Sequence, residues 1–387
     1  MEFYHDILEN LLDKLIDYRG KTPKKTLSGV PLVTAKIVKN GTINGYTEYI
    51  AEEDYDKWMV RGFPKVGDVI LTTEAPLGEV ALLKEEKVAL AQRIVCLRGK
   101  DNVLDNTYLK YYLQSGKGQK SLSARESGTT VTGIKQAELR RVDIEYPAYD
   151  DQRRIASILS SLDRKIELNN KINADLEEMA QAIFKNWFVD FEPFKDGKFV
   201  DSELGMIPEG WKVGTLDEIF SLKYGKNLST SMILEKGDYP VYGANGIIGY
   251  YNEYNCDKYS VLVTSRGNGS GDVSRTHHPK SFITNNSFVV EPLEQYKYIE
   301  LPFINGLFNI IDFKSYCSGS AQPQLTNKAM RNICIISPPM EIVIKYCEML
   351  ETLFSHIECV IAENSRLSTL RDTLLPRLMS GELEVPE

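Results

Sequence analysis

The strongest constraint on this chain is an internal repeat. Shifting the 387-residue sequence by 191 positions aligns two long stretches without a gap. "SGTTVTGIKQAELRRVDIEYP" at 127–147 lies over "SGSAQPQLTNKAMRNICIISP" at 318–338, and matching residues continue through the segments that follow. Upstream, "GDVILTTEAPLGEV" at 67–80 more weakly resembles "YSVLVTSRGNGSGDV" at 259–273. The chain therefore has to fold as one block and connector, followed by a second copy of both.

Each copy combines a β-rich block with a long helix. Short runs such as "VILTT", "IVCLRG", "SVLVTS" and "SFVVEP" are separated by Gly, Asn and Pro, which is typical of strands and turns. The segments after them carry apolar residues at alternating steps of four and three, which is typical of a coiled coil. The seam positions include Leu162, Ile166, Asn173 and Leu176, and their counterparts Leu353, Ile357, Asn364 and Leu367.

Connectivity sets the direction of the two helices. The first leaves one block and delivers the chain to the other, so the second must run back if the two pack together. We therefore predict an α+β fold: two β-rich domains separated by two long antiparallel coiled-coil helices, with a pseudo-two-fold repeat. The predicted boundaries are 1–148 and 191–338 for the domains, with the helices in 149–190 and 339–387.

The first helix carries three asparagines in "LDRKIELNNKINADLEEM" at 162–179. The repeat places Asn173 opposite Asn364, where polar seam residues would cost stability but penalise slipped registers. Alternatively, the asparagines face solvent or a third helix. A helix over 152–188 would be roughly 55 Å long at 1.5 Å per residue, about a turn and a half of B-DNA. The arrangement suggests a helical spacer of fixed length with a recognition domain at each end.

The overall charge of −8 does not exclude nucleic acid, because the acidity is concentrated at one end. Residues 1–150 contain 22 basic and 22 acidic residues, whereas 339–387 contain four basic and nine acidic ones. Within 110–141, seven basic residues stand against two acidic ones, which predicts a local basic patch.

Composition also bears on location. No apolar run approaches the length of a membrane span, and the acidic N-terminus does not resemble a signal peptide. The six cysteines have no paired spacing, so we expect reduced, mostly buried cysteines in a cytoplasmic protein.

No pattern in the sequence predicts catalysis. "SPPM" at 337–340 has two prolines but no aromatic residue to stack a flipped base, so it is interpreted as a strand end before a helix. "GNGSGD" at 267–272 lacks the glycine spacing and following helix of a dinucleotide loop, so a turn is expected. The four histidines form no metal-ligand spacing. We expect no catalytic residue, no metal and no cofactor of its own.

Three segments resemble one family across essentially the whole chain. "DQRRIASILSSLDRKIELNNKINADLEEMAQAIFKNWFVDFEPF", "SELGMIPEGWKVGTLDEI" and "LLPRLMSGEL" are similar to the specificity subunit of type I restriction-modification systems. The resemblance implies a non-catalytic, DNA-binding protein with two target recognition domains, each reading half of a bipartite double-stranded target. It also implies that the helices set the spacer and dock two methyltransferase subunits, joined by restriction/translocase subunits. S-adenosylmethionine is then expected on the partner methyltransferase subunits.

Candidate DNA-binding residues are small polar or basic residues in predicted loops, where the backbone approaches phosphate and side chains reach phosphate or base edges. In the first domain they are Lys36, Lys39, Thr72, Thr73, Gln92, Arg93, Thr129, Thr130 and Lys135. In the second they are Tyr242, Asn245, Ser265, Arg266, Asn268, Ser270, Gln322 and Gln324. The loop before Lys135 leads into a short helix whose N-terminus could take a phosphate. Each residue could equally lie in an ordinary solvated turn, so the hypothesis rests on the set.

The second long helix carries apolar residues off its seam, Ile342, Met349 and Leu370. Because a two-helix pair would leave them exposed, they are predicted to bind helices of partner proteins. The alternative for the whole chain is a helical scaffold or adaptor that does not bind DNA. An adjacent gene for an adenine methyltransferase would favour the first interpretation.

Overall fold

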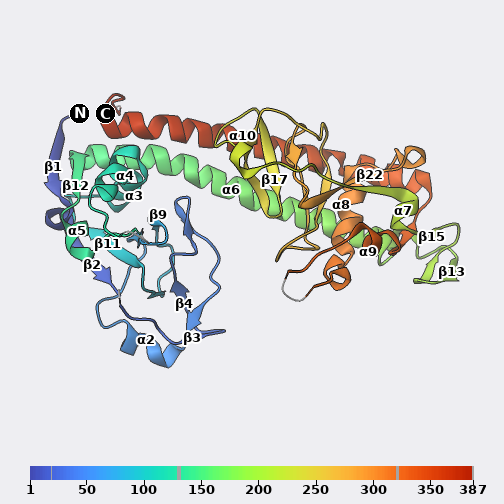
Figure 1. Ribbon diagram of the computed structural model, residues 1–387, viewed down its shortest axis with the longest axis horizontal. Helices are drawn as coiled ribbons and strands as arrows, with labels where there is room; N and C mark the ends of the chain where they lie inside the picture. Colours follow the sequence, from blue (N-terminus) through green and yellow to red (C-terminus); the bar gives the residue numbers. More distant parts are fainter. Residues whose placement is uncertain (19, 129–131, 320–321, 386–387) are drawn as a thin grey trace. The chain divides into compact units, whose positions relative to one another are not determined.

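A computed structural model describes residues 1–18, 20–128, 132–319 and 322–385. By its internal contacts the chain divides into two compact units, Met1–Glu167 with Asn364–Glu387, and Leu168–Glu363. Each unit combines a block of sheets and short helices with portions of two long helices, α6 (Tyr149–Phe188) and α10 (Met340–Ser380) (Figure 1).

The first unit is built on two four-stranded sheets with strand orders β2-β11-β8-β9 and β10-β4-β7-β3. Its strands are β1 (Phe3–Ile7), β2 (Leu12–Asp17), β3 (Lys25–Thr26), β4 (Val30–Val33), β5 (Val38–Lys39), β6 (Thr42–Ile43), β7 (Tyr49–Ile50), β8 (Val69–Thr73), β9 (Leu77–Leu82), β10 (Ala89–Leu90), β11 (Ile94–Gly99) and β12 (Asp143–Pro147). Its short helices are α1 (Leu8–Leu11), α2 (Glu52–Trp58), α3 (Asn106–Gln114), α4 (Gly116–Ser123) and α5 (Gln136–Arg140).

The second unit has a four-stranded sheet of order β16-β22-β19-β20 and a three-stranded sheet of order β18-β17-β21. Its strands are β13 (Phe199–Ser202), β14 (Gly205–Pro208), β15 (Lys212–Thr215), β16 (Phe220–Tyr224), β17 (Tyr239–Gly243), β18 (Gly246–Tyr251), β19 (Val261–Thr264), β20 (Val273–Arg275), β21 (Phe282–Ile283), β22 (Ser287–Pro292) and β23 (Cys334–Ser337). Its short helices are η1 (Glu192–Phe194), α7 (Leu216–Ile219), η2 (Thr230–Met232), η3 (Glu294–Tyr296), α8 (Leu301–Ile310), η4 (Phe313–Tyr316) and α9 (Asn327–Arg331).

The two units repeat one topology. The larger sheets have corresponding orders, and in each smaller sheet one pair is parallel, β4 with β10 and β17 with β21. The strand that opens each copy pairs antiparallel with the strand before the long helix, β1 with β12 and β15 with β23. The predicted α+β fold with an internal repeat is therefore confirmed, and the repeated topology includes the sheets of each block as well as the segments that lead into the long helices.

Strand alternation places the larger sheet between two cores. Successive side chains of a strand point to opposite faces. Val69 and Leu71 of β8 pack in a cluster with Ile155 and Leu159 of α6, whereas Ile70 belongs to the cluster shared with the smaller sheet. The fully buried run "VILTT" is thus a central strand with a core on each side.

The long helices are antiparallel within each unit. In the first unit, Ile155 packs in the same cluster as Leu378, and Asp163 accepts a 3.0 Å hydrogen bond from Arg371. In the second unit, the Phe184 ring lies 5.8 Å from the ring of Tyr346. Residues later in α6 therefore contact residues earlier in α10, and the antiparallel prediction is confirmed for each unit.

Asn169, an asparagine of the seam, is joined to the facing helix. Asn169 is buried, and its side-chain amide donates to Glu363 at 2.7 Å. The expected pairing of Asn173 with Asn364 joins residues of different units and stays a prediction. Of the other seam positions, Ile357 is buried, while Leu162, Ile166, Leu176, Leu353 and Leu367 are half-buried.

Within the described ranges, none of the helices has the length and apolar character that crossing a membrane requires. All six cysteines are free; Cys96, Cys256 and Cys347 are buried, whereas Cys334 and Cys359 are exposed. The expectation of mostly buried cysteines therefore holds for only half of them.

Candidate nucleic-acid interface

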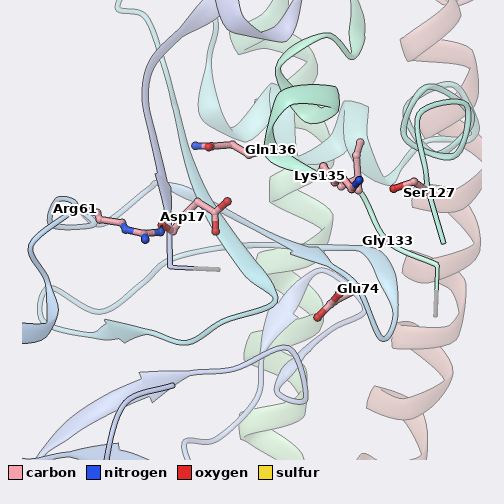
Figure 2. Close-up of a pocket in the computed structure, with 8 residues that line it drawn as sticks. Asp17, Arg61, Glu74, Ser127, Gly133, Lys135 and Gln136 are labelled. Carbon is pink, nitrogen blue, oxygen red and sulfur yellow. The ribbon is translucent and has the colours of Figure 1, made fainter. Parts of the chain in front are cut away.

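A pocket of about 530 Å³ in the first unit brings together residues from distant parts of the sequence (Figure 2). Asp17 lies at the end of β2, Glu74 follows β8, and Arg61 comes from the loop after α2. The segment between α4 and α5 and the first residue of α5 complete the lining with Ser127, Gly133, Ile134, Lys135 and Gln136. Arg61 donates to the carbonyl oxygen of Asp17 at 2.5 Å, so its guanidinium is tied to one wall.

Backbone hydrogen bonds form a frame beneath this pocket. The N–H of Thr73 donates to the carbonyl of Arg93 at 2.8 Å, and the N–H of Ile134 donates to the carbonyl of Thr73 at 2.9 Å. Ser127 and Gly133 exchange two further bonds, at 2.8 and 3.1 Å. Three separate segments are thereby held side by side, and the side chains at their edges are presented from fixed positions.

The second unit contains the same frame. The N–H of Ser265 donates to the carbonyl of Asn286 at 2.7 Å, and the N–H of Leu325 donates to that of Ser265 at 2.9 Å. Ser318 and Gln324 exchange bonds of 2.9 and 2.8 Å. Each backbone bond of one unit therefore has its counterpart in the other.

The side chains on the two frames differ. Glu74 corresponds to Arg266, since each is bridged to the loop residue opposite it. The frame bonds likewise match Arg93 with Asn286, and Gly133 with Gln324. One backbone arrangement thus carries a carboxylate and a guanidinium in the first unit, and a guanidinium and two amides in the second.

Most predicted DNA-binding residues lie at the surface. Lys36, Lys39, Arg93, Lys135, Asn245, Arg266, Asn268 and Gln322 are exposed, and Gln92 and Gln324 are half-buried. Lys36 and Asn245 occupy corresponding positions beyond β4 and β17, because Val33 and Tyr242 accept equivalent backbone bonds from Ala91 and Thr284, each at 3.0 Å. Thr129 and Thr130 lie outside the described residues.

Five predicted residues are buried, and assigning them to the interface was wrong. The hydroxyl of Thr72 accepts the N–H of Glu79 at 2.9 Å, and Thr73 is enclosed at the end of β8. Tyr242 is buried, and its hydroxyl accepts the N–H of His277 at 2.8 Å. Ser265 and Ser270 donate to backbone carbonyls of Asn285 and Pro323. Four of these side chains bond to groups of the fold and all five are buried, so none of them presents a donor at the surface.

The predicted basic patch at 110–141 is also wrong. Five of its seven basic residues are engaged in ion pairs, at N–O distances from 2.6 to 3.6 Å. Lys110 is the extreme case, because its ammonium group is buried and lies 2.8 Å from Asp163. A charge count over this segment misses most of these pairs, since four of the five basic residues have acidic partners outside 110–141.

Four residues of the two frames and the pocket were not predicted from the sequence, namely Arg61, Glu74, Gln136 and Asn286. Gln136 follows Lys135 directly, and Glu74 follows the selected Thr73, so a wider window would have included both. Arg61 and Asn286 have no such local signal. Their place at the site depends on strand pairing between distant segments.

Two ion clusters fix the blocks to the long helices. In the first unit, Asp163 of α6 binds Lys110 of α3 and Arg371 of α10. Although burial opposes ionisation, these cations hold the pKa of Asp163 below its ordinary value. In the second unit, Arg275 of β20 pairs with Glu358 of α10 at 2.7 Å and with Glu177 of α6 at 3.3 Å. The second block is thereby tied to both long helices, and the first is tied to α6, which is itself paired with α10.

The interpretations of "GNGSGD" and "SPPM" are confirmed. Residues 267–271 form the turn between β19 and β20, and Ser337 ends β23 just before α10. Among the described residues, no group of three or more His, Cys, Asp or Glu side chains is arranged to hold a metal ion.

The apolar residues selected on α10 behave differently from one another. Met349 and Leu370 are 45% and 47% exposed, as the partner hypothesis requires. Ile342 is half-buried and packs against the main core of the second unit, so its assignment to an exposed face was wrong.

Comparison with known proteins agrees with this architecture. Residues 13–178 and 208–369 match the family described as "Type I restriction modification DNA specificity domain". A type I restriction enzyme specificity subunit of Methanocaldococcus jannaschii, MjaIX, is 29% identical, over 95% of this chain and 91% of the relative. The HindI specificity subunit of Haemophilus influenzae is 25% identical, over 68% of this chain and 74% of the relative.

The fold agrees with a solved structure. The crystal structure of a type I restriction-modification S subunit from M. genitalium aligns with a TM-score of 0.55 at 21% identity, covering 100% of this chain and 97% of the other. Since the family's sequence pattern covers both copies of the repeat, this chain belongs to the type I restriction-modification DNA specificity family and has a DNA specificity role.

Proposed function

We propose that each unit reads one half of a bipartite double-stranded DNA target, and that the paired long helices determine the unread spacer. The chain contributes recognition and no catalysis of its own. It acts within a complex containing two methyltransferase subunits, which bind S-adenosylmethionine, and restriction/translocase subunits. We place this complex in the cytoplasm, in keeping with the free cysteines.

The observation that carries this proposal is the duplicated frame with different polar side chains. Four backbone hydrogen bonds recur between the units, whereas the side chains at matched edges change from Glu74 and Arg93 to Arg266 and Asn286. Sequence is read by hydrogen bonds to base edges, so a fixed frame with exchanged donors and acceptors suits two different half-sites. If the chain were a helical scaffold that does not bind DNA, there would be no reason for the two units to share the frame while their side chains differ.

The partner assignment is supported by the outer surface of α10. Met349 and Leu370 are large apolar side chains left half exposed by the helix pair. Helix bundles bury such residues against further helices. MjaIX, which matches nearly the whole chain, is named as a specificity subunit of a restriction enzyme, and this favours an assembly with enzyme subunits.

The independence of the two readers is tested by exchanging one of them. Residues 1–148 are replaced by the corresponding block of another specificity subunit, and the hybrid is expressed with the methyltransferase subunits. Methylation sequencing should show one half-site changed, with the other half-site and the spacer retained. If both half-sites change, the units do not read independently, and if wild-type complex methylates no bipartite site the proposed function is wrong.

A further inference from the structure

Each frame carries one exposed arginine, and the two arginines stand at different positions of the frame. Arg93 precedes β11 in the first unit, and Arg266 follows β19 in the second. Arginine is the side chain that most often reads guanine, because its planar fork matches the O6 and N7 acceptors in the major groove. Resting on the proposed function, we propose that Arg93 and Arg266 each read a guanine in their respective half-sites.

Arg93 is held in a way that suits this role. Its backbone adopts φ 74°, a left-handed conformation that residues other than glycine rarely adopt. The Thr73 N–H bond to its carbonyl holds that backbone in place. Such outliers cluster at functional sites, where surrounding structure over-determines them.

The Arg93 guanidinium is anchored at one edge. Its Nε lies 3.0 Å from Oε1 of Glu74, while half of the side chain remains exposed. A guanidinium has five N–H donors, so an ion pair on the Nε side leaves the Nη1 and Nη2 edge for a second bidentate partner. Glu74 therefore acts as a positioning residue. Because it holds the Arg93 guanidinium in one orientation before DNA binds, the Arg93 side chain loses less conformational entropy on binding.

Arg266 differs in its surroundings. It is bridged through the backbone to Gln324, and Asn286 is held beside the same strand by the Ser265 bond. Both neighbours are amides, which pair with adenine rather than orient a cation. The two units should thus share guanine recognition while differing in the base that adjoins it.

The test measures base discrimination by the complete complex with its methyltransferase subunits. Affinity is determined for the natural site and for duplexes in which each recognised base pair is changed in turn. Arg93→Gln should reduce discrimination at one G·C pair of the first half-site by about 5- to 150-fold and leave the second half-site unaffected. Glu74→Gln should weaken discrimination at that same pair, and Arg266→Gln should act on one G·C pair of the second half-site only.

Two controls separate base reading from phosphate binding. Lys135→Gln removes an exposed cation that lines the pocket together with Glu74, and is expected to weaken binding to all duplexes alike. Lys57→Gln removes an exposed cation on α2, away from the frame, and should change neither affinity nor discrimination. If Arg93→Gln and Arg266→Gln weaken binding to all duplexes uniformly, or leave all affinities unchanged, the proposal that these arginines read guanine is overturned. The wild-type bipartite site in the same assay shows whether the proposed function itself holds.

Discussion

At the scale of single residues, the decisive property was the direction of each side chain. Thr72 and Arg93 both stand beside turn-like sequence, yet Thr72 is enclosed in β8 and Arg93 is exposed. Composition selected small polar and basic residues, but the same residue types also satisfy buried backbone groups, as Ser270 does for Pro323. Distinguishing the two roles requires strand register and long-range pairing, which a single sequence does not contain.

His277 provides a prediction at this scale. Its Nδ1 is buried and lacks a hydrogen-bond partner within the part of the chain that the structure describes. Burial, together with the charges of Arg275 and His278, lowers its pKa from 6.5 to about 4. Between these values the unfolded chain binds more protons than the folded one, so stability present above pH 6.5 is lost as the pH falls towards 4.

The measurement is urea unfolding of the wild type and of His277→Gln at pH 7 and pH 4.5. The wild type should lose about 2 kcal/mol through this group, and the variant should show a correspondingly flatter dependence. His356→Gln, at an exposed position on α10, is the matched control. Equal pH dependence in all three proteins would show that His277 is not held neutral by the fold.

At the scale of elements, periodicity predicted the long helices and their antiparallel pairing, because heptads are local and the repeat supplied the partner. It did not predict which off-seam residues the β-rich block would cover. Ile342 and Met349 both lie off the seam of α10, but the core of the second unit packs against Ile342 and leaves Met349 exposed. The outer face of a helix is defined by tertiary packing as well as by its period.

Met349 and Leu370, the two off-seam residues of α10 that remain exposed, give a prediction about partners. Met349→Lys and Leu370→Lys place a charge where we expect a partner helix to pack, and burying an unpaired charge is strongly unfavourable. Both variants should fold, since the positions are 45% and 47% exposed in the chain alone, but co-purification with the methyltransferase subunit should be lost. Thr352→Lys, at another exposed position on α10, is the control. Full recovery of the complex with both lysine variants would place the partner elsewhere.

At the scale of the whole molecule, the two readers are useful only if the distance between their half-sites is defined. The same chain segments that join the units, α6 and α10, are continuous helices across the boundary between them. The hydrogen bond between Asn169 and Glu363 sets their register close to that boundary. A continuous helix changes length only by insertion or deletion, so the spacer should respond to helix length rather than to the chemistry of the helix surface.

Matched insertions test this directly. Four residues are inserted after Asn170 in α6 and after Ala362 in α10, so that both helices lengthen at facing positions near the Asn169–Glu363 bond. Each helix gains about 6 Å and turns about 40° beyond one full turn, whereas two base pairs span about 6.8 Å and turn roughly 70°. We expect a spacer lengthened by one or two base pairs with both half-sites unchanged, read by single-molecule methylation sequencing. A matched seven-residue insertion, which preserves the heptad phase, adds about 10.5 Å and should add roughly three base pairs. Active insertion variants that retain the original spacer would mean that the helices connect the readers without measuring the DNA between them.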